Sequence, residues 1–88
     1  MANSSLNETL RETAATNRFQ IATLIESLLR SVEFLTVDIE CEEARVGVRD
    51  LSDPAYSVLA RSLTVRRENI RATIASLEMS IKETRKAA

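Results

Sequence analysis

The stretch RVGVRDLSDPAYSVLARSL, residues 45–63, holds the only glycine, the only proline and the only tyrosine of this 88-residue chain. Helix-forming residues predominate on both sides of it. A β-rich fold needs turn residues at every hairpin, and one glycine with one proline provides for one well-marked turn. The sequence therefore predicts an all-α fold, an antiparallel helical hairpin of two long helices with its corner at about residues 50–54.

Two residues of this stretch are suited to a corner. Gly47 weakens a helix by about 1 kcal/mol relative to alanine, and it can either cap a helix C-terminus or lie within the last turns. Pro54 fits the first turn of a helix, because its missing N–H would be unpaired there. We therefore expect the second helix to begin at Pro54 and to run to about Lys86, with Asp53 or Ser52 as its cap.

Apolar side chains before the corner recur at alternating steps of four and three residues, which is the spacing of one buried helix face. Residues 13–18, TAATNR, are weak helix formers and leave two alternatives. Residues 1–17 are either a polar N-terminal arm or an extension of the helix, and residues 18–88 form the hairpin. The buried row is broken only by Glu42 and consists of Ile21, Ile25, Leu28, Val32, Leu35, Ile39 and Val46, with Leu24 widening it.

A second apolar row follows the corner, and charge favours its pairing with the first. Residues 1–53 hold five basic and ten acidic side chains, whereas residues 54–88 hold seven basic and three acidic ones. A hairpin places an acidic helix against a basic one, so we expect Asp38, Glu40, Glu42 and Glu43 to lie level with Arg61, Arg66 and Arg67. The second row consists of Tyr56, Leu59, Leu63, Ile70, Ile74, Leu77 and Ile81.

Further apolar residues repeat on the opposite side of each helix, where a two-helix hairpin leaves them in water. Another copy of the hairpin would cover them and give a four-helix bundle. We therefore expect a homo-oligomer, preferably a dimer, with a second helical protein as the alternative partner. The predicted interface includes Phe34, Val37, Cys41 and Val48 on the first helix, or Val58, Val65 and Met79 on the second.

Residues that carry chemistry are scarce. The chain has no histidine, which removes the usual general base and the usual metal ligand, and one glycine cannot form a phosphate loop. Glu40 and Glu43 in ECEE could hold a hard cation weakly, but a solvated acidic face is the favoured interpretation. Cys41 is interpreted as a small buried apolar side chain. We predict no catalytic, cofactor-binding or metal-binding residues.

These observations predict a non-catalytic interaction module, such as a small scaffold, adaptor, chaperone or regulator, that acts through helix–helix contacts. One cysteine excludes an intramolecular disulfide. The N-terminal residues lack the basic start and apolar run of a signal peptide, and no apolar run is long enough to span a membrane. We therefore expect a cytoplasmic protein that does not bind membranes.

Two alternatives stay open. The turn SDPA, residues 52–55, resembles that of type III secretion needle subunits, although Leu51 stands where those turns have a second proline. This resemblance covers the corner alone and implies a needle-like subunit or its small co-chaperone. The other alternative is a regulator that binds RNA or DNA through Arg67, Arg71 and Arg85 of the second helix. The near-zero net charge and the lack of interleaved aromatic residues disfavour nucleic-acid binding.

Overall fold

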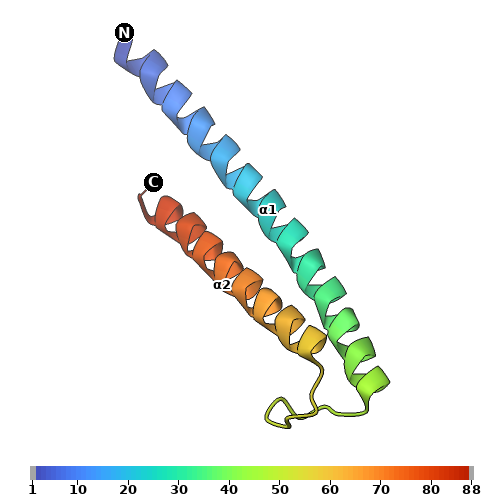
Figure 1. Cartoon of the computed structure of the whole chain (residues 1–88). Helices are drawn as coiled ribbons and strands as arrows, with labels where there is room; N and C mark the ends of the chain where they lie inside the picture. The colour runs from blue at the N-terminus through green and yellow to red at the C-terminus, as the bar shows by residue number, and fades with distance from the viewer. Residues whose placement is uncertain (1, 88) are drawn as a thin grey trace.

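The computed structural model describes residues 2–87 of the chain and the side chains of residues 8–83. Helix α1 spans Ala2–Val46 and helix α2 spans Val58–Ala87. Figure 1 shows the two helices side by side and antiparallel. Between residues 2 and 87 the structure contains no strand. The predicted all-α hairpin of two long helices is confirmed.

Helix α1 is much longer than helix α2. At 1.5 Å per residue the two helices measure about 68 and 45 Å, and the longest dimension of the molecule is 69 Å. The N-terminal part of α1 therefore extends past the end of α2 (Figure 1). The weak segment of residues 13–18 does not break α1, and the hydroxyl of Thr13 donates to the carbonyl of Thr9 at 2.9 Å within the helix.

Gly47 ends α1. Its N–H donates to the carbonyl of Glu43 at 2.8 Å, and its φ of +81° lies in the left-handed region that side chains with a Cβ adopt at a cost. Of the two roles that the sequence allows for Gly47, the structure shows the C-terminal cap. The helix consequently ends at Val46, before the predicted corner at about residues 50–54.

The corner consists of two successive tight turns. The N–H of Asp53 donates to the carbonyl of Asp50 at 3.1 Å, and the N–H of Tyr56 donates to the carbonyl of Asp53 at 3.0 Å. Each aspartate side chain also accepts the N–H two residues further on, at 2.9 and 2.8 Å. Pro54 occupies the second position of the second turn, where its fixed φ is favourable. The prediction that α2 begins at Pro54 is therefore wrong.

Ser57 is the residue that caps α2. Its Oγ accepts the N–H of Ala60 at 3.1 Å and donates to Oε1 of Glu42 on α1 at 2.9 Å. The neighbouring Tyr56 hydroxyl donates to Oε2 of Glu43 at 2.9 Å. Because the start of α2 is bonded to α1 at two adjacent points, these contacts set the level at which the helices face each other.

The core is small and lies near the corner. Ile39, Tyr56 and Ala60 form its centre, with Val48 and Leu63 packed against it, and Ile74 is buried further along α2. The predicted inner row of α1 is confirmed for its seven members from Ile21 to Val46, which are buried or half-buried, whereas Leu24, predicted to widen the row, is exposed. On α2 the predicted Leu59 is exposed, and Ala60 takes its place. The inner row of α2 consists of Ala60, Leu63, Arg67, Ile70, Ile74, Leu77 and Ile81.

Candidate functional site

Shallow grooves lie on one flank of the hairpin. One, with a volume of about 450 Å³, lies between Cys41 of α1 and Leu59 of α2. A second lies between Phe34 and Arg66, and another is lined by α1 alone. Apart from the half-buried Ile21, Leu35 and Glu42, the residues that line the grooves are spaced by three, four or seven along α1 and by three or four along α2, which places them on one side of each helix. We call this surface the grooved flank; its residues are Asn17, Gln20, Leu24, Ser31, Phe34, Asp38, Cys41 and Arg45 of α1 with Leu59, Leu63, Arg66 and Ile70 of α2.

The grooved flank is rich in exposed apolar side chains. Phe34 is 71% exposed and Leu24 is 47% exposed, although both lie beside the half-buried inner row. Leu59 and Cys41 are exposed across the helix pair from each other. The sequence assigned Leu24 and Leu59 to the inner rows. Leu59 lies about 100° around α2 from the inner residue Ala60, and Leu24 lies about 100° around α1 from the inner residue Ile25.

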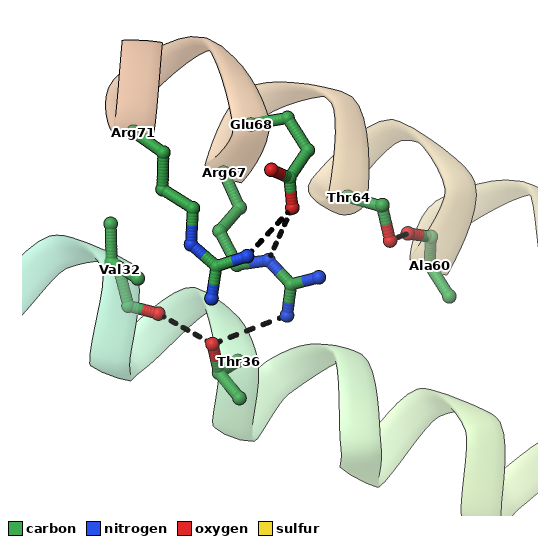
Figure 2. Close-up of polar contacts among 7 residues, drawn as sticks. All are labelled: Val32, Thr36, Ala60, Thr64, Arg67, Glu68 and Arg71. Carbon is green, nitrogen blue, oxygen red and sulfur yellow. Dashed lines mark hydrogen bonds and ion pairs between the residues drawn. The ribbon is translucent and has the colours of Figure 1, made fainter. Parts of the chain in front are cut away.

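The opposite flank is polar, and we call it the charged flank. Figure 2 shows Arg67 reaching from α2 to α1, where its guanidinium Nη1 donates to Oγ1 of Thr36 at 3.3 Å. Arg67 and Arg71 both bond the same oxygen of Glu68, at 3.2 and 2.9 Å. The inner row of α2 is therefore interrupted by an arginine whose partners are a hydroxyl on α1 and a carboxylate on its own helix.

Among the side chains of residues 8–83, no ion pair joins the acidic α1 to the basic α2, although the sequence predicts that their charged residues lie level. Each ion pair in this part of the chain joins two residues of the same helix. Glu42 bonds Arg45 one turn away on α1, and it also accepts a hydrogen bond from the hydroxyl of Ser57, the cap of α2. Residues three apart on a helix already face each other, so this local pair forms at a lower entropic cost than a pair between helices.

The predicted interface residues fall on different faces of the hairpin. Phe34 and Cys41 line the grooved flank. Val48 packs half-buried against the core of its own chain, because the chain leaves the helix at Gly47. The remaining four residues are exposed on the outer edges, which face away from each other: Val37 on α1, and Val58, Val65 and Met79 on α2. Cys41, interpreted as buried from the sequence, is exposed in the single chain.

The titratable groups with shifted pKa values lie at the corner. The hydrogen bond from Arg45, followed by that from Ser57, lowers the pKa of the Glu42 carboxyl, whose side chain is 13% exposed. Bonds from the Ser52 hydroxyl and N–H lower the pKa of Asp50. Desolvation, together with the contact with Glu43, raises the pKa of Tyr56. The hydrogen bonds of these groups hold the corner in place.

Within the part of the chain that the structure describes, no three histidine, cysteine, aspartate or glutamate side chains gather as ligands. Neither helix, over its described residues, contains a segment apolar enough to cross a bilayer.

Comparison with known proteins identifies no relative. No family model matches the chain, and no curated protein or solved structure matches it. What the grooved flank and the two outer edges can bind is therefore inferred from the chemistry of their side chains.

Proposed function

We propose that this protein is a non-catalytic helical interaction module that works through helix–helix contacts. The observation that carries the proposal is how little the hairpin buries. Its buried apolar residues are Ile39, Tyr56, Ala60 and Ile74, and its accessible surface is 6740 Å². A compact protein of this mass exposes about 5,200 Å², so the single hairpin exposes about 1,500 Å² more.

The exposed surface is apolar in an ordered way. Large apolar side chains are exposed at heptad-related positions on the grooved flank and at multiples of seven residues on the outer edge of α2. Scattered exposed apolar residues are ordinary on a protein surface, whereas regular rows along a helix form a seam that fits another helix. Among the described side chains, the exposed large apolar residues are Leu10, Phe19, Leu24, Leu29, Phe34, Val37, Leu51, Val58, Leu59, Val65 and Met79.

The nucleic-acid alternative finds less support in the charges. Two of the arginines that it needs, Arg67 and Arg71, are both bonded to Glu68, and Arg67 is half-buried against Thr36 (Figure 2). Their charge is partly neutralised locally, which weakens the field that would attract phosphates. The third, Arg85, has a side chain outside the described residues. The proposed interaction module therefore has stronger physical support than the nucleic-acid-binding regulator.

Photo-crosslinking in the native cell tests the proposal. A photoreactive phenylalanine analogue replaces Phe34 on the grooved flank, Val65 on the outer edge of α2, or Glu40 as a polar exposed control on the charged flank. We expect a discrete cross-linked protein, a second copy or another chain, from at least one apolar position and none from Glu40. Failure of both apolar positions to give a discrete product, in cells that contain the folded protein, would contradict the proposal.

A further inference from the structure

We infer that the grooved flank docks a second copy of this chain, stacked so that α1 of each copy lies over α2 of the other. The inference rests on the proposed function, because it names the partner of the same apolar surface. The result is a two-fold symmetric four-helix bundle with both corners at the same end.

The area suits a dimer. Each hairpin exposes about 1,500 Å² more than a compact chain of its mass, and a standard protein interface buries about 800 Å² on each partner. The excess is therefore sufficient for one such interface along the length of the helix pair.

The grooved flank is the face that a second copy can cover at the lowest cost. Its exposed charges are Asp38, Arg45 and Arg66, whereas the charged flank carries Glu40, Glu43, Arg67, Glu68, Arg71, Glu78 and Lys82. Desolvating charges costs free energy unless they are paired, so the grooved flank is preferred. The two outer edges face in opposite directions, and one flat partner cannot cover both.

The charge of each helix selects the order of stacking. Residues 1–53 have a net charge of −5 and residues 54–88 one of +4, from five basic against ten acidic and seven basic against three acidic side chains. Stacking α1 on α1 would bring two acidic helices together. Stacking α1 on α2 surrounds each acidic helix with two basic ones, which is electrostatically complementary.

Two exposed charges then meet across the interface. Phe34 and Arg66 line the same groove, and Asp38 lies about one turn from Phe34 on the same side of α1. With both corners at one end, the second copy presents Arg66 at nearly the level of Asp38. Neither residue takes part in an ion pair among the side chains of residues 8–83. The two-fold axis creates this contact twice.

A matched pair of variants tests the face. Leu24 on the grooved flank and Leu29 on the charged flank are both 47% exposed, and they lie about 140° apart around α1. By analytical ultracentrifugation, Leu24→Asp should raise the dimer dissociation constant about tenfold or more, and Leu29→Asp by less than about threefold. Circular dichroism checks that both variants stay helical. Equal effects of the two changes, or a larger effect of Leu29→Asp, would overturn the choice of face.

A charge swap tests the order of the helices. Asp38→Arg and Arg66→Asp should each weaken the dimer about tenfold, and the double variant should restore it to within about threefold of the wild type. Stacking of α1 on α1 brings the exchanged charges no closer, so absence of rescue would overturn the proposed order. A monomeric wild type that cross-links to a different protein through Phe34 would overturn the second copy as partner and leave the proposed function standing.

Discussion

The hydroxyl of Ser57 donates to Oε1 of Glu42 at 2.9 Å, and the same oxygen of Ser57 accepts the N–H of Ala60 at 3.1 Å. One buried side chain thus caps α2 and attaches its first turn to α1. This arrangement fixes the level of the two helices without any charge pair between them. A substitution at Ser57 therefore tests both the cap of α2 and the contact between the helices.

Replacing Ser57 by alanine should lower the free energy of unfolding by about 1–2 kcal/mol, because the variant loses the cap and leaves the Glu42 carboxylate with one partner fewer. Chemical denaturation at fixed protein concentration measures this loss. Ser62→Ala, an exposed change within α2, is the control and should cost nothing. A Ser57→Ala variant as stable as the wild type would show that the cap contributes nothing.

The pH dependence of stability should report on Glu42. Its pKa in the folded protein lies below the ordinary value of 4.5, so the stabilisation is present above pH 4.5 and is lost as the pH falls through the folded pKa. We expect the wild type to lose more unfolding free energy than Glu42→Gln between about pH 5 and pH 3. Parallel pH profiles of the two proteins, measured by thermal denaturation, would contradict this assignment.

Gly47→Ala should destabilise the protein by about 1–2 kcal/mol through the backbone alone. The glycine has a φ of +81°, and a methyl group at this position meets no atom within 4 Å, so steric crowding contributes nothing. Gly47→Asn should be less harmful, because asparagine tolerates the left-handed region. An alanine variant with unchanged or increased stability would show that α1 can end in another way.

A cavity in the small core should be costly. Ile39→Ala should lower the unfolding free energy by about 2–5 kcal/mol, because Ile39 packs between Tyr56 and Ala60. Val37→Ala, two residues away on the exposed outer edge of α1, is the matched control and should cost less than about 0.5 kcal/mol. Similar losses from the two changes would indicate that the outer edge is buried in the assembled protein.

The sequence predicts the helices and the inner row of α1 well, because heptad spacing directly reflects which face of a helix is buried. The start of α2 is predicted incorrectly, since Asp53 and Pro54 suit a tight turn as well as the first turn of a helix. Ser57 is the cap, and its bond to Glu42 is a tertiary contact that the sequence alone does not indicate. Leu59 and Ala60 lie on either side of the same helix face, and the apolar pattern alone does not predict which of them is buried.

The grooved flank could be predicted only in part. Phe34 and Cys41 are identified from the sequence as leftover apolar residues, but their position relative to Leu24 and Leu59 depends on how the helices are rotated about their axes. The position of Val48 could not be predicted from the heptad count either. It continues the heptad count in the sequence, yet Gly47 turns the chain and directs Val48 into the core.

Sedimentation velocity of the wild-type chain between about 1 and 100 μM tests the central claim most directly, because self-association through the exposed apolar surface must depend on concentration. We predict a species of twice the chain mass that predominates at the upper concentrations and gives way to the monomer on dilution. The grooved-flank variant Leu24→Asp should shift this transition to higher concentration. A wild-type chain that remains monomeric over the whole range would contradict the account of a hairpin completed by a second copy.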